Sequence, residues 1–142
     1  MSQIVFVCTG NTCRSPMCAA LYNDRFATTL TATSCGINAY SKLISYEAVD
    51  ALIGFGVKPK ASNDFTSHIS QNINMDIVKN AEIIIGVTSA HSEYVKNLFP
   101  EYSDKVKSFS RDIFDPYGGD IVIYNRCLEM INEEMTKLFK GD

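Results

Sequence analysis

The chain has 142 residues, of which 46% are hydrophobic and 20% are charged, and its formal net charge is -3. These values are typical of one globular domain over residues 1–142, and they argue against a protein that binds nucleic acid through its charge. No apolar run is long enough to span a membrane, and the first residues lack the basic and apolar regions of a signal peptide. We therefore expect a cytoplasmic protein, favoured as a monomer, with neither nucleic acid nor a membrane as a partner.

The cysteines show neither the spacing of a disulfide framework nor that of a zinc site. The five are Cys8, Cys13, Cys18, Cys35 and Cys127. An odd number without such spacing is typical of free thiols in a reducing compartment. We expect no bound metal and no cofactor, and we interpret the last three cysteines as core residues.

The first predicted element is a buried strand at residues 3–7, a run of mostly β-branched and apolar side chains. It leads into the segment Cys8-Thr9-Gly10-Asn11-Thr12-Cys13-Arg14-Ser15-Pro16. Ser15 suits the N-cap of a helix and Pro16 its first position, so we predict a helix from Pro16 to about Ala27. A strand that turns into a helix through a loop with glycine points backbone N–H groups into one hollow, where the helix dipole favours an anion. We call residues 8–15 the anion loop.

The side chains of the anion loop suit both the binding of a phosphate and an attack on it. Arg14 carries a planar fork of donors for two phosphate oxygens. Cys8 lies in the same positive field, which is expected to lower its pKa from ~8.5 into the range of roughly 3.5 to 7.5 and so to favour a nucleophilic thiolate. Ser15 can donate to the sulfur, and Asn11 can brace the loop. The alternative is an ordinary strand-to-helix turn with a buried cysteine. A nucleotide P-loop is excluded because no Gly-Lys-Ser/Thr follows.

The remaining elements are predicted from hydrophobic periodicity and from capping residues. In chain order they are a strand at 30–35, a loop at 37–44 that contains Tyr40, a helix at 46–55 capped by Ser45, a turn at 58–64, a short helix at 75–80, a central strand at 81–87, a helix at 90–99 capped by Ser89, an edge strand at 105–109, and a long helix at 121–138 capped by Asp120. His91 lies in the first turn of the helix at 90–99, and we interpret it as a surface residue.

This order predicts an α/β fold, a three-layer sandwich with a four-stranded parallel sheet flanked by helices, because right-handed β-α-β crossovers make the strands parallel. Sites in such sheets lie at the carboxyl ends of the strands. Cys8 follows the first strand and residues 111–119 follow the fourth, so Asp115 can meet the anion loop. The alternative is that Asp115-Pro116 and Gly118-Gly119 only form a turn.

Two segments resemble known ones. Residues 8–16 are similar to the signature loop of the low-molecular-weight protein tyrosine phosphatase family, and Asp115-Pro116-Tyr117-Gly118 resembles its general-acid loop. The similarity extends over essentially the whole chain. Thr12, where tyrosine phosphatases usually carry Ile, and Gly118-Gly119, where many carry a second Tyr, resemble the bacterial protein arginine phosphatase branch. The resemblance also implies that His68 supports the loop by a hydrogen bond to Asn11, although a lone histidine is often only structural.

The resemblance implies a cysteine-dependent phosphatase that acts on phosphorylated protein side chains. Cys8 would attack phosphorus while Arg14 and the N–H groups of the loop hold the oxygens, and Asp115 would protonate the leaving group and later activate water. Between the two substrates we favour phosphoarginine over phosphotyrosine, because Thr12 offers a shorter and more polar wall than Ile. Tyr40 and Tyr117 are expected to flank either substrate in the pocket.

Three other functions are compatible with a similar loop. An arsenate reductase must relay oxidation through further cysteines, and none occurs between Cys35 and Cys127. A phosphoryl carrier forms a phosphocysteine but needs neither Arg14 nor the acid Asp115. A phosphate-binding module would retain binding after loss of Cys8 and have no activity to lose. Cys13 is either a redox partner that forms a reversible disulfide with Cys8 or a small buried side chain.

Overall fold

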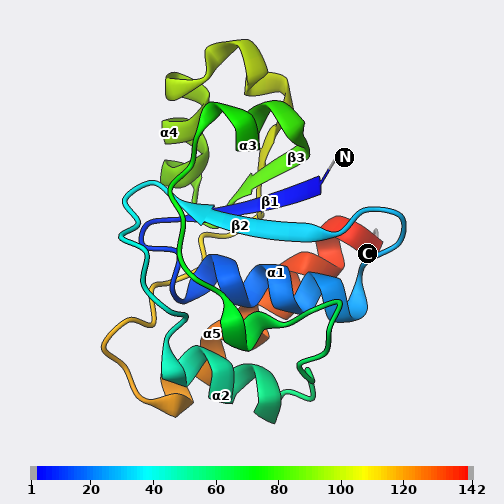
Figure 1. Cartoon of the computed structure of the whole chain (residues 1–142), viewed down its shortest axis with the longest axis vertical. Helices are drawn as coiled ribbons and strands as arrows, with labels where there is room; N and C mark the ends of the chain where they lie inside the picture. The colour runs from blue at the N-terminus through cyan, green and yellow to red at the C-terminus, as the bar shows by residue number, and fades with distance from the viewer. Residues whose placement is uncertain (1–2, 141–142) are drawn as a thin grey trace.

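The computed structural model describes residues 3–140, and a four-stranded parallel sheet forms its middle layer (Figure 1). The strands are β1 (Gln3–Cys8), β2 (Ala32–Gly36), β3 (Ala81–Gly86) and β4 (Val106–Ser108). Their order in the sheet is β2-β1-β3-β4, so the strand that ends in Cys8 lies inside the sheet and β4 lies at an edge. The predicted parallel sheet and its edge strand are confirmed.

Helices cover both faces of the sheet. They are α1 (Arg14–Arg25), α2 (Tyr46–Gly54), α3 (Met75–Asn80), α4 (Ser89–Leu98) and α5 (Ile121–Lys140), with two 3-10 helices, η1 (Phe65–Ser67) and η2 (Pro100–Lys105). In Figure 1, α1, α2 and α5 lie below the sheet, and α3 and α4 lie above it. The predicted three-layer α/β sandwich is therefore confirmed.

Alternate residues of β1 enter two separate cores. Ile4 and Phe6 pack with residues of α1, α2 and α5, whereas Val5 and Val7 pack with residues of α3 and α4. All four side chains are at most 2% exposed, as expected for a strand that is covered on both faces.

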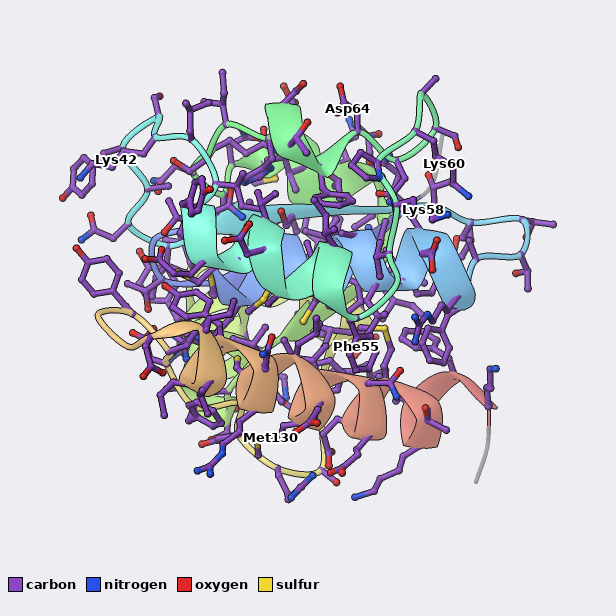
Figure 2. All side chains as sticks on the ribbon, turned by 90° about the horizontal axis from the view of Figure 1, so that it is seen from below. Lys42, Phe55, Lys58, Lys60, Asp64 and Met130 are labelled. Atoms are coloured by element: carbon purple, nitrogen blue, oxygen red, sulfur yellow. The ribbon has the colours of Figure 1, made fainter. Side chains whose placement is uncertain are left out.

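The face seen in Figure 2 shows α2 and α5 side by side, with Phe55 between them. Lys58, Lys60 and Asp64, which Figure 2 labels, lie in the predicted turn and are exposed.

Several predicted boundaries and caps differ from the structure. Ser15 is not the N-cap of α1, because the helix begins at Arg14 and the Ser15 side chain lies against Cys8 instead. The N-cap of α4 is Thr88 and not Ser89, since the Thr88 hydroxyl accepts the backbone N–H of His91 at 3.2 Å. The second strand begins at Ala32 rather than at residue 30. Each difference reflects tertiary contacts that local patterns do not contain.

The strands on either side of β1 both end in a glycine. Gly36 lets the anion loop lie close to the backbone of β2, and Gly86 lets the start of α4 lie close to the backbone of β3. A Cβ atom at Gly36 would lie 2.4 Å from the Thr9 carbonyl oxygen, and one at Gly86 would lie 2.4 Å from Ser92 Oγ. Real side chains do not tolerate such contacts. The loop and the start of α4 therefore rest directly on the backbone of β2 and β3.

A buried carboxylate on α5 holds the start of the segment that carries Asp115. The Glu134 side chain is fully covered and accepts hydrogen bonds from the backbone N–H of Ser110, from Nε of Arg111 at 2.8 Å and from Nζ of Lys137 at 3.0 Å. Burial by itself would raise the pKa of Glu134, but these hydrogen bonds outweigh it and lower the pKa to about 2. We call these contacts the Glu134 anchor.

Candidate active site

The anion loop lies at the carboxyl end of β1 and forms the floor of a cavity of about 260 Å³. Part of the wall comes from two other segments, which contribute Asn38, Tyr40 and Lys42 after β2, and Asp115 and Tyr117 after β4. The structure thus brings the segment after the fourth strand to the segment after the first, as the topology predicts.

Asn11 sets the bend of the anion loop. Its φ of 60° lies in the left-handed region, which asparagine adopts more readily than most residues. Its amide nitrogen donates to Ser15 Oγ at 2.8 Å and to Ser34 Oγ at 2.9 Å, and its side-chain oxygen accepts the backbone N–H of Gln71. His68 Nε2 donates to the backbone carbonyl of Asn11 at 2.9 Å, so the contact that the resemblance implies is made to the main chain. Every polar atom of the Asn11 side chain is thereby used to hold the loop.

The Cys8 sulfur lies at the bottom of the cavity, and the residue is 3% exposed. Ser15 Oγ lies 2.9 Å from Sγ, and the backbone N–H of Asn11 donates to Sγ at 3.3 Å. Burial raises the pKa of the Cys8 thiol, while Ser15, the charge of Arg14 and the Asn11 N–H oppose the rise. The lowered pKa expected from the loop's dipoles is therefore wrong for this structure, because a covered thiolate loses its hydration. These donors determine how much thiolate forms.

Removal of the Ser15 hydroxyl tests whether the hydrogen-bond donors beside the sulfur oppose the effect of burial on the pKa of Cys8. We expect Ser15→Ala to raise the pKa of Cys8 further, since a donor to the thiolate is lost while the burial remains. Less thiolate at a given pH would move the acidic limb of the kcat/KM profile to higher pH by about one unit. The measurement is the rate at which iodoacetamide modifies the Cys8 peptide as a function of pH, followed by mass spectrometry.

Ser34→Ala is the matched control for that variant. Ser34 also accepts from the Asn11 amide, but it makes no contact with the sulfur among the described residues. Its pH midpoint should stay at the wild-type value. A midpoint that does not move in Ser15→Ala would contradict the role of the hydroxyl.

Arg14 and Asp115 face each other across the cavity. Arg14 is 7% exposed, and its Nη1 donates to the Ile113 carbonyl at 3.1 Å, which fixes the guanidinium. Nη2 lies 3.7 Å from Oδ2 of Asp115, whose side chain is 57% exposed. The other Asp115 oxygen, Oδ1, accepts the backbone N–H of Tyr117 at 3.0 Å. Cys8, Arg14 and Asp115 thus share one cavity, with the carboxylate open to a substrate.

The mouth of the cavity is lined by the side chains predicted to flank a substrate. Tyr40 and Tyr117 are 70% and 78% exposed, and Thr12 lies in the wall with its carbonyl accepting the N–H of Ser45. Lys42 was not singled out from the sequence, although it lies in the predicted loop at 37–44 and adds a cation to the wall (Figure 2). These side chains provide two aromatic surfaces, one hydroxyl and one positive charge.

Cys13 is buried and faces away from the sheet. Its Sγ lies 3.2 Å from Tyr124 Oη on α5, and it donates to Ser45 Oγ at 3.6 Å. These contacts are compatible with the packing alternative, and all five cysteines are free thiols. A disulfide between Cys8 and Cys13 stays a prediction.

The interpretation of His91 as a surface residue is wrong. The residue is 5% exposed, and its Nε2 lies 2.9 Å from Thr9 Oγ1 in the anion loop. The start of α4 lies against the loop because Gly86 lets the chain turn tightly there. In the sequence, the signal for this contact is a threonine and a histidine three residues apart, Thr88 and His91, directly after the central strand β3.

Within residues 3–140, no group of three histidine, cysteine or acidic side chains is arranged to hold a metal ion. Over the same residues, no helix combines the length and the apolar character needed to cross a membrane.

Comparisons with known proteins agree over the whole fold. The family model for low molecular weight phosphotyrosine protein phosphatase matches residues 3–141. A protein-arginine-phosphatase from Bacillus subtilis is 32% identical, over 97% of this chain and 95% of that protein. The arginine phosphatase YwlE from Geobacillus stearothermophilus superposes with a TM-score of 0.87 and 30% identity, over 99% of this chain and 92% of that one. A low molecular weight protein tyrosine phosphatase from T. tengcongensis gives a TM-score of 0.88 at 27% identity, covering 100% of both chains.

Proposed function

This chain belongs to the low molecular weight phosphotyrosine protein phosphatase family, and from that membership we propose that Cys8, Arg14 and Asp115 hydrolyse phosphorylated protein side chains. The family's enzymes are metal-independent phosphatases. The observation that carries the proposal is the position of a buried thiol, a fixed guanidinium and an open carboxylate in one cavity.

In the first step, the Cys8 thiolate attacks the phosphorus of the bound phosphoryl group. The S–P bond forms as the bond from phosphorus to the leaving atom breaks, and Asp115 gives its proton to that atom. Arg14 and the N–H groups of the anion loop stabilise the charge on the three other oxygens. The product side chain leaves, and a phosphocysteine remains.

In the second step, water hydrolyses the phosphocysteine. Asp115, now a carboxylate, accepts a proton from the water as the oxygen attacks phosphorus, and the S–P bond breaks. Inorganic phosphate is released, the thiolate is restored, and Asp115 is protonated again for the next cycle. One carboxyl group therefore serves both steps, which its exposure beside the cavity allows.

We propose phosphoarginine as the preferred substrate. A guanidine leaving group has a pKa of about 12.5 to 13.8 against about 10 for a phenol, so protonation by Asp115 matters more for it. Thr12 presents a short polar side chain to the cavity, which suits a flat polar group. Relatives from Bacillus subtilis and Geobacillus stearothermophilus carry the name protein-arginine-phosphatase, which supports the same choice.

Thr12→Ile tests the choice of substrate. We expect the ratio of kcat/KM for phosphoarginine to that for phosphotyrosine to fall about tenfold, because a larger apolar side chain replaces the hydroxyl in the wall. Both substrates are measured as phosphorylated peptides of one sequence. Thr12→Ser keeps the hydroxyl and should retain most of the wild-type ratio. An unchanged ratio in Thr12→Ile would remove Thr12 from the argument.

Phosphotyrosine is the second candidate substrate. The rings of Tyr40 and Tyr117 at the mouth offer aromatic surfaces against which a phenyl ring can pack. A wild-type preference for phosphotyrosine peptides in the same measurement would favour this function. We further propose a cytoplasmic location, which is where buried free thiols such as the five in this chain usually occur.

A further inference from the structure

We propose that His91 is a positioning residue of the anion loop, which donates from Nε2 to Thr9 Oγ1 and so directs the hydroxyl hydrogen of Thr9 toward a bound phosphoryl group. The inference rests on the proposed function, since it adds one more donor to the same phosphate site. The inference depends on two points. The first is which nitrogen of the His91 ring carries the hydrogen, and the second is whether the hydroxyl hydrogen of Thr9 is free to be donated to a ligand.

The contacts of the ring determine its tautomer. Thr88 Oγ1 lies 2.8 Å from Nδ1 and also accepts the backbone N–H of His91 at 3.2 Å. These are its only partners among residues 3–140, so its single hydrogen is satisfied only if it is donated to Nδ1. Nδ1 is then the acceptor, and a neutral ring carries its hydrogen on Nε2. That hydrogen points at Thr9 Oγ1, 2.9 Å away.

The ring is neutral because of its surroundings. Burial and the nearby charge of Arg14 lower the pKa of His91 to about 4, although Asp112 and Asp115 act in the opposite direction. At neutral pH the ring therefore has one hydrogen to donate. It adds no positive charge beneath the guanidinium of Arg14.

Thr9 lies in the wall of the cavity, and both its main-chain carbonyl and its hydroxyl group are hydrogen-bonded. Its carbonyl accepts the backbone N–H of Asn38 at 3.0 Å, and its hydroxyl oxygen accepts from His91. Within the described residues the Thr9 hydroxyl has no second partner, so its own hydrogen remains to be donated. The cavity that Thr9 lines is the open direction for it. A phosphate oxygen is the acceptor that this geometry favours.

Four variants separate this role from simple packing. Thr9→Val removes the hydroxyl, and Thr9→Ser keeps it. His91→Asn has an amide near the position of Nδ1 and is too short to reach Thr9, whereas His91→Gln places an N–H donor near the position of Nε2. The measured quantity is the dissociation constant of inorganic phosphate, obtained by calorimetry and as a competitive inhibition constant against an aryl phosphate.

We expect Thr9→Val and His91→Asn each to weaken phosphate binding by about tenfold, the usual effect of losing one hydrogen bond to a charged group. The double variant should bind no more weakly than Thr9→Val alone, because both changes remove the same donor. Thr9→Ser and His91→Gln should stay within about threefold of the wild type.

Three results would overturn the proposal. The first is wild-type phosphate affinity in Thr9→Val, whose exposed side chain makes a folding defect a poor explanation. The second is a double variant whose loss equals the product of the single losses. The third is a nitrogen-15 NMR spectrum of the wild-type protein with the imidazole hydrogen on Nδ1, which needs no variant to fold. A wild-type protein that neither binds phosphate nor hydrolyses an aryl phosphate would overturn the proposed function together with this inference.

Discussion

Cys8→Ser is expected to lower the turnover of an aryl phosphate by at least about 10³-fold, since a serine hydroxyl is a weak nucleophile without a base. Among residues 3–140, no such base is hydrogen-bonded to the sulfur. Its hydrogen-bonding neighbours are the Ser15 hydroxyl and the backbone N–H of Asn11, which stabilise an anion but do not take up a proton. Asp115 pairs with Arg14, and in the proposed mechanism it transfers its proton to the leaving group instead of accepting one from residue 8.

The same variant distinguishes an enzyme from a phosphate-binding module. The donors of the anion loop and Arg14 are unchanged in Cys8→Ser, so the dissociation constant of inorganic phosphate should change only a few-fold. Turnover is measured by steady-state kinetics, and the intermediate by trapping a phosphorylated Cys8 peptide from the wild type. Cys127→Ser is a suitable control, because Cys127 is buried on α5 and its Sγ donates to the Phe114 carbonyl, outside the anion loop. Substantial activity in Cys8→Ser would exclude the thiolate mechanism.

Asp115→Asn is expected to lower kcat/KM for phosphoarginine peptides by about 10²- to 10⁴-fold, the usual contribution of a general acid. The loss should be much smaller for a nitrophenyl phosphate, whose leaving group needs little protonation. Asparagine keeps the oxygen that accepts the Tyr117 N–H, so the local loop is preserved. Since both steps use the carboxyl group, the phosphocysteine should also last longer in this variant. Steady-state kinetics on both substrates, with rapid quenching to follow the intermediate, measures these effects.

Asp112→Asn is the matched control for the general acid. Asp112 lies three residues earlier in the same segment, but its carboxylate accepts the backbone N–H of Ser89 at 2.8 Å. It should change kcat by only a few-fold for either leaving group. Equal losses of kcat/KM on good and poor leaving groups in Asp115→Asn would contradict a proton transfer from this residue to the leaving group.

The fold could be predicted because its elements have strong local patterns. The apolar run of β1 reads as a buried strand, and the spacing of three and four residues along α5 identifies its inner face. Tyr124, Leu128, Ile131 and Met135 of that face are all buried. The proximity of Cys8 and Asp115 could also be predicted, because the carboxyl ends of parallel strands lie at one edge of the sheet.

Contacts between distant segments account for what could not be predicted. Serine is a residue type that often caps helices, but the fold places the Ser15 side chain against the sulfur of Cys8. His91 follows a helix start like many surface histidines, and only the approach of α4 to the anion loop reveals its burial. The pKa of Cys8 depends on how completely the sulfur is covered, which no local pattern contains.

The Glu134 anchor also determines how the protein responds to acid. Its carboxylate has a pKa of about 2 in the folded chain against a usual 4.5, so the folded state binds this proton less readily than the unfolded state. The stabilisation is complete above pH 4.5 and is lost as the pH falls toward 2, and the shift corresponds to roughly 3 kcal/mol. From mildly acidic to neutral pH, the start of the segment that carries Asp115 thus stays attached to α5. In stronger acid the carboxyl group is protonated, and this contribution to stability is lost.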